Sequence, residues 1–176
     1  LLVKAPPASG KSRALMFVGL DKLFNQAQRK VIVSVPERSI GQSFASTKLS
    51  EFGFWADWEV KPENNLCTPG SSKAKVSEFV RFMSGSDSTI ICTHATLRFA
   101  FEKMSPSEFN GCVLAIDEFH HVSADTESSR LGALLADVIN GSDAHLVAMT
   151  GSYFRGDAVP ILLPEIEGLF TPVTFN

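Results

Sequence analysis

The sequence is poor in cysteine and histidine, with three of the first and four of the second among 176 residues. Cys67, Cys92 and Cys112 never form a C-x-x-C pair, and two of them lie inside apolar runs, so we expect buried, reduced thiols. The histidines lack metal-ligand spacing with the cysteines, which argues against a structural zinc site. A fold that depends on disulfides or zinc is therefore not expected.

Long hydrophobic runs are also lacking. The longest, such as residues 113–116, are far too short to cross a bilayer, and the N-terminus has no charged-then-apolar signal peptide layout. We therefore expect a soluble, cytoplasmic protein with no membrane partner. The chain begins on Leu1 inside an apparent strand and without an initiator Met, which predicts that it is a piece of a longer protein.

There is no excess of positive charge, since the formal net charge is -3. This argues against a module that binds nucleic acid mainly through a broad basic face. It does not exclude a nucleic-acid motor, because main-chain N–H groups, hydroxyls and helix N-termini contact phosphates without adding formal charge. The hydrophobic content of 44% and charged content of 20% suit one globular domain.

Short apolar runs alternate with helical patterns, which predicts an α/β fold with a mostly parallel central sheet covered on both sides. Strands are expected at residues 1–5, 31–35, 89–92, 112–116 and 145–149, with weaker candidates at 54–60 and 172–175. Residues 62–72 are expected to form a loop. Core-facing helical stripes are expected at Met16, Leu20, Leu23, Phe24 and Ala27; at Val76, Phe79, Val80 and Met83; at Leu97, Ala100, Phe101 and Met104; and at Leu131, Leu134, Leu135, Val138 and Ile139, with Asp125 as N-cap and Gly141 as the stop.

Residues 5–12 read A-P-P-A-S-G-K-S and follow a predicted strand, which is the setting of a phosphate-binding loop, or Walker A motif. Lys11 would reach the β- and γ-phosphates of ATP, and the Ser12 hydroxyl would ligate Mg²⁺. Gly10 permits backbone conformations that a side chain would obstruct. The two prolines lack an N–H group, so the phosphate contacts are expected from Ala8, Ser9, Gly10, Lys11, Ser12 and Arg13.

Asp117 and Glu118 come directly after the buried run 113–116, at the carboxyl end of a predicted strand, where ligands bind in open parallel sheets. Asp117 would hold the divalent ion, and Glu118 would polarise the water that attacks the γ-phosphate. The alternative is a surface acidic pair that caps a loop.

Residues 117–120, D-E-F-H, resemble the D-E-x-H box of superfamily 2 helicases and translocases. Residues 5–12 resemble the first motif of that family, in which Ala followed by Pro often replaces the leading Gly. The resemblance implies that residues 1–176 form one three-layer RecA-like ATP-binding domain, the first of two motor domains. It also implies ATP and Mg²⁺ as cofactors, nucleic acid as partner, and catalytic roles for Lys11, Glu118 and His120. The box is not D-E-A-D, and no upstream Gln segment is visible, which disfavours an RNA-remodelling enzyme of the D-E-A-D type.

Three further segments resemble motifs of the same family. Arg38, in P-E-R-S-I, and Thr93, in I-I-C-T-H-A-T-L, would contact the nucleic-acid backbone. Their alternatives are a solvated surface Arg and a simple helix N-cap. Thr150 and Ser152, in T-G-S, would bond to the acidic box, at His120, and couple phosphate chemistry to strand binding. Their alternative is an ordinary turn.

Two other functions remain open at the level of sequence. One is a P-loop domain that uses ATP as a conformational switch in protein assembly, without nucleic acid. The other is a degenerate domain with a purely structural role.

Overall fold

The computed structural model describes residues 1–6, 8–119, 126–151 and 172–174. Its centre is a six-stranded sheet in the order β3-β2-β4-β5-β1-β6, and every neighbouring pair is parallel. The strands are β1 (Leu2–Lys4), β2 (Lys30–Val35), β3 (Thr89–Thr93), β4 (Cys112–Ile116), β5 (His145–Thr150) and β6 (Pro172–Thr174). The five main strand predictions are confirmed to within one or two residues, and the weaker candidate at 172–175 forms the edge strand β6.

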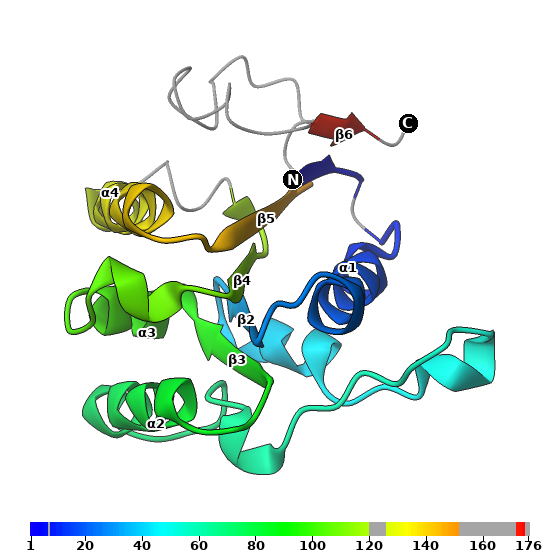
Figure 1. The fold of residues 1–176 in the computed structure, drawn as a ribbon, viewed down its shortest axis with the longest axis horizontal. Helices are drawn as coiled ribbons and strands as arrows, with labels where there is room; N and C mark the ends of the chain where they lie inside the picture. Colours follow the sequence, from blue (N-terminus) through cyan, green and yellow to red (C-terminus); the bar gives the residue numbers. More distant parts are fainter. Residues whose placement is uncertain (7, 120–125, 152–171, 175–176) are drawn as a thin grey trace.

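Helices cover both faces of the sheet, as Figure 1 shows. One face packs against α1 (Lys11–Asn25), and the other packs against α2 (Ser72–Ser84), α3 (His94–Phe101) and α4 (Thr126–Gly141). Short 3-10 helices form at η1 (Arg38–Phe44), η2 (Leu49–Phe52), η3 (Pro62–Asn64) and η4 (Pro106–Phe109). Two separate hydrophobic clusters fill the spaces between the layers. The fold is therefore the predicted three-layer α/β arrangement.

β2 and β4 show why the sheet needs two helical layers. Every described position of both strands is buried, whichever face its side chain points to. Ile32 and Leu114 belong to the cluster under α2, α3 and α4, whereas Val31 and Val113 belong to the cluster under α1. Apolar residues at both alternations are typical of strands covered on both sides.

The strand predicted at residues 54–60 is wrong. The segment contributes only an isolated antiparallel bridge between Thr47 and Trp58. Trp58 is 1% exposed, and its indole N–H donates to the Phe44 carbonyl at 2.8 Å. One large anchoring side chain holds this segment, whereas the prediction assumed a ladder of strand hydrogen bonds.

The predicted helical stripes need small corrections. Phe24 is 65% exposed, and Ala27 lies beyond the end of α1 with a positive φ of 55°. In α2, Val80 is 38% exposed, and the core position is taken by Phe82 instead. α3 ends before Met104, which is nevertheless buried.

Gly141 is the last residue of α4, whereas the sequence predicted it as the residue that stops the helix from outside. The predicted N-cap Asp125 lies outside the described residues. The expected loop at 62–72 is irregular apart from η3 and the start of α2.

The three thiols are free and buried, as predicted, and burial raises the pKa of Cys67, Cys92 and Cys112. None of the helices in the described parts of the chain combines the length and the apolar character needed to span a bilayer.

A parallel sheet places the carboxyl ends of all its strands along one edge. The strands β4, β5 and β1 are consecutive in the sheet, so the segments that follow them lie together. The segments that follow β3 and β2 lie beside them on the same edge. The described candidate site residues all lie at the carboxyl end of one of these five strands or in the segment that follows it.

Candidate functional site

The segment between β1 and α1 forms an open backbone turn at the start of a helix. Ala8 and Gly10 both have left-handed backbone conformations, with φ of 62° and 85°. Gly10 is the N-cap of α1, and it supplies no side chain to cap the first N–H groups of the helix. Main-chain N–H groups arranged in this way, with the positive end of the helix dipole behind them, form an anion-binding site.

The Lys11 ammonium group lies between the phosphate loop and the acidic box. It donates to the carbonyls of Ala5 and Pro6, both at 3.3 Å, and lies 3.8 Å from Oε1 of Glu118. Lys11 and Glu118 are 107 positions apart in the sequence, and β1 and β4 bring them together from two sides of β5. The structure thus joins the first two predicted motifs in one site.

Glu118 adopts an unusual backbone conformation, with φ of 46°. A left-handed conformation in a residue with a side chain costs about 1–3 kcal/mol and is enriched at functional sites. The Glu118 carboxylate accepts a hydrogen bond from the Gly151 N–H at 3.3 Å. These contacts hold the carboxylate beside the Lys11 ammonium group.

Asp117 is almost completely buried, with 5% of its surface exposed. Burial and the neighbouring Glu118 charge raise the pKa of Asp117 to about 6, although the Lys11 charge acts in the opposite direction. Its main-chain N–H donates to the Ser34 carbonyl of β2 at 2.9 Å. A buried carboxylate beside a second acid is an electrostatically costly arrangement that a cation would relieve.

The end of β5 completes this site from the other side. A side chain at Gly151 would begin 3.0 Å from the Lys11 ammonium group and 3.7 Å from Oε1 of Glu118. Thr150 is fully buried, and its carbonyl accepts from the Ala5 N–H at 3.2 Å. Thr150 therefore contacts the start of the phosphate loop, and Gly151 lies against both Lys11 and the acidic box.

Arg38 and Thr93 belong to a second site on the same sheet edge. Both line a pocket of about 520 Å³ between η1, α2 and α3. The Thr93 hydroxyl accepts from the Thr96 N–H at 3.3 Å and is the N-cap of α3. The N-cap alternative is thus correct for Thr93, and it coexists with a position on the pocket wall.

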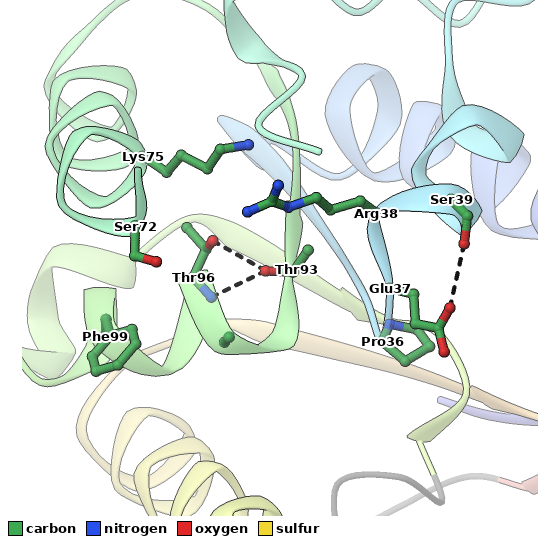
Figure 2. Close-up of a pocket in the computed structure, with 10 residues that line it drawn as sticks. Pro36, Glu37, Arg38, Ser39, Ser72, Lys75, Thr93, Thr96 and Phe99 are labelled. Atoms are coloured by element: carbon green, nitrogen blue, oxygen red, sulfur yellow. Dashed lines mark hydrogen bonds between the residues drawn. The ribbon is translucent and has the colours of Figure 1, made fainter. Parts of the chain in front are cut away.

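The pocket also contains residues that the sequence analysis did not single out. Figure 2 shows the side chains of Arg38 and Lys75 pointing toward one another across it, with Ser72 and Thr96 on the adjacent wall. Lys75 donates to the carbonyls of Leu66 and Thr68 and is 5% exposed. Burial, followed by the nearby Arg38 charge, lowers the pKa of Lys75. The local sequence contained no signal for Lys75, because its place in the pocket depends on Arg38 from a distant segment.

Ser34 connects the two sites through β2. Its carbonyl accepts from the Asp117 N–H, and its hydroxyl lies 2.7 Å from Nδ1 of His94, the residue after Thr93. The acidic box and the helix that begins at the pocket are therefore separated by one buried serine.

A family model described as DEAD/DEAH box helicase matches residues 1–155, nearly the whole chain. The chain belongs to this helicase family. The assignment covers both the Lys11–Glu118 site and the Arg38–Thr93 pocket.

Individual relatives agree with this assignment. The helicase-family chain is 66% identical over its entire length to YeeB of Bacillus subtilis (strain 168), a protein named as a candidate ATP-dependent helicase. It spans 29% of that relative's length. The crystal structure of the Pyrococcus furiosus Hef helicase domain matches 99% of the chain and 34% of its own length, with a TM-score of 0.64 and 16% identity. That likeness supports the RecA-like helicase fold.

Two residues predicted from the family resemblance lie outside the described part of the helicase domain, namely His120 and Ser152. Their roles stay predictions. The Arg13 guanidinium group lies over the ring of Phe52, so the phosphate contact predicted for Arg13 concerns its main-chain N–H. Ser12 lies in the first turn of α1, next to Lys11.

Proposed function

We propose that this domain binds and hydrolyses ATP as the first motor domain of a superfamily 2 helicase or translocase. The observation that carries the proposal is the 3.8 Å approach of the Lys11 ammonium group to Glu118, which brings the phosphate loop and the acidic box into one site. Family membership supports the same activity. A cytoplasmic location, where ATP and nucleic acid occur together, is part of this proposal.

Different residues of the site have different roles in ATP binding and hydrolysis. Main-chain N–H groups of residues 8–13 and the Lys11 ammonium group bind the phosphates. Glu118, beside the Lys11 ammonium group, accepts a proton from the attacking water. A bound Mg²⁺ would neutralise charge on the phosphates.

Ser12 and Asp117 are the proposed ligands of that ion. The buried Asp117 carboxylate fits this role, because burial and the Glu118 charge raise its pKa and a divalent cation would offset both effects. His120 is proposed to join the acidic box to the hydroxyls of Thr150 and Ser152.

The second part of the proposal concerns the pocket. Arg38, Lys75 and the hydroxyls of Thr93 and Ser72 provide donors for a phosphate backbone without a broad basic surface. The net charge of -3 is compatible with this mode of binding. Ser34 would connect it to the nucleotide site, because it contacts both Asp117 and His94.

Steady-state ATP hydrolysis by the full-length protein, with and without DNA or RNA, tests the proposal. Nucleic acid should accelerate hydrolysis. Lys11→Ala should abolish ATP binding, and Glu118→Gln should preserve binding but lower turnover by about 100-fold or more, the usual effect of removing a general base. Equal turnover in Glu118→Gln and in the native protein would contradict the proposed role of the acidic box.

The same measurements separate the alternative functions. An assembly switch would bind ATP and show no acceleration by any nucleic acid. A purely structural domain would not be stabilised by ATP, so its melting temperature would stay constant as ATP is added.

A further inference from the structure

An exposed phenylalanine lies at the end of the nucleotide site. The guanidinium group of Arg13, the residue directly after Ser12, lies over the ring of Phe52 at 4.7 Å from the centroid. The Phe52 residue is 66% exposed, although it is large and apolar. An exposed aromatic ring this close to the phosphate loop needs a physical reason.

Phe52 is held firmly in this position. It is the last residue of η2, and the next residue, Gly53, donates its N–H to the carbonyls of Leu49 and Ser50. Leu49 is completely buried and fixes the start of η2 in the core.

Asp57 stabilises the same turn from the returning chain. Its carboxylate accepts from the Ser50 N–H and from the Lys48 ammonium group, both at 2.9 Å. The Ser50 hydrogen bond, followed by the contact with Lys48, lowers the pKa of Asp57 to about 2. The exposure of Phe52 is thus a property of a well-bonded turn.

Other exposed aromatic side chains on this side of α1 pair with each other. Phe24 is 65% exposed and meets the ring of Trp55 edge to face at 5.1 Å. It lies eleven positions after Arg13 on α1, roughly 16 Å along the helix axis from the phosphate loop. Phe52 differs from Phe24 in its position at the nucleotide end of α1.

We infer that the Phe52 ring, beside Arg13, is the surface on which the base of the bound nucleotide stacks. The inference rests on the proposed ATP site. With phosphates on the first N–H groups of α1, the ribose and base must leave the phosphate loop, and Arg13, in the first turn of α1, joins that loop to the Phe52 ring. Aromatic rings and guanidinium planes are the groups on which bases stack in proteins, and stacking accepts any base, because every base has a π face.

If the base stacks on Phe52, removal of the ring should weaken the binding only of ligands that contain a base. Phe52→Ala should weaken binding of MgATP and MgGTP by about tenfold, within the range measured for single base–aromatic contacts. It should leave the affinity for Mg²⁺ tripolyphosphate, which has phosphates but no base, unchanged. Phe52→Tyr should retain nucleotide affinity, since the ring is preserved. Phe24→Ala, with a similarly exposed ring far from the phosphate loop, is the matched control and should change neither affinity.

Calorimetric titration of these ligands into the purified protein distinguishes the outcomes. Equal weakening of ATP and tripolyphosphate in Phe52→Ala would overturn the inference, because the ring would then act only through the phosphate site. Unchanged ATP binding in Phe52→Ala would also overturn it, and the proposed function would stand if Lys11→Ala still abolished binding of both ligands. If Lys11→Ala changed neither affinity, the proposed function would fail, and the stacking surface with it.

Discussion

At the scale of single residues, the smallest side chain in the nucleotide site has a clear role. Gly151 leaves the space that the Lys11 ammonium group occupies, since a Cβ atom there would lie 3.0 Å from Nζ. Gly151 is not among the residues with positive φ, so an alanine fits the backbone without strain. Lys11, which ends in a flexible ammonium group, is the part that must move.

We therefore expect Gly151→Ala to weaken ATP binding by about tenfold, or 1.4 kcal/mol, with the melting temperature unchanged or slightly raised. Nucleotide titration and thermal melting measure the two effects. Gly85→Ala is the control, because its Cβ would meet only main-chain oxygens at ordinary distances of 3.4 and 3.5 Å. A marked fall in melting temperature for Gly151→Ala would show that the glycine serves the fold instead of the site.

The sequence was sufficient to predict some residues of the two sites and not others. The shared position of Lys11, Asp117 and Glu118 was predictable because each follows a buried strand, at the edge where ligands bind in parallel sheets. Phe52 and Lys75 were not predictable, because their significance depends on contacts with segments far along the chain. Nothing in the local sequence around Phe52 indicates that Arg13 lies over its ring.

At the scale of elements, the segment 54–60 shows where periodicity fails as a guide. Its alternating apolar residues suggested a strand, yet in the structure it lies along α1 and is anchored by Trp58. The Trp58 ring fits against α1 at Gly19, where a Cβ would lie 3.0 Å from it. The buried Trp58 side chain holds this segment in place, and the predicted ladder of strand hydrogen bonds does not form.

Trp58→Phe should lower the free energy of unfolding by about 1–3 kcal/mol, because it removes the donor to the Phe44 carbonyl and leaves that carbonyl buried. Urea denaturation followed by circular dichroism measures this loss. Trp55→Phe is the matched control: Trp55 is 53% exposed, so the change should stay within about 0.5 kcal/mol. Similar losses in both variants would mean that the indole hydrogen bond contributes little.

At the scale of the whole molecule, the two proposed sites share one edge of the sheet. The phosphate loop and acidic box follow β1 and β4, and the pocket follows β2 and β3. The alternation of buried strands and amphipathic helices was sufficient to predict this layered fold, because both periods were visible in the sequence. The strand order was not predictable, since it depends on packing between distant segments.

The domain as described supplies one positive group, Lys11, beside Glu118. In the proposed motor, arginines of a second domain complete the charge around the γ-phosphate. The isolated 176-residue chain should therefore bind ATP and hydrolyse it about a thousandfold or more slowly than the full-length protein, since an arginine at that position contributes about that factor. Single-turnover hydrolysis by the two forms measures the ratio. Comparable rates would contradict a second-domain contribution.

The position of β1 in the sheet has a consequence for biosynthesis. Leu2 pairs with Ala148 on one side and with Pro172 on the other, so the strand that begins the phosphate loop has no partner until β5 has been translated and is paired on both sides only after β6. β2, β3 and β4 pair with one another and can assemble earlier, as the ribosome delivers the middle of the chain. A truncated nascent chain would thus contain the pocket's strands but no competent nucleotide site, and the ability to bind ATP would be the last property that the emerging polypeptide acquires.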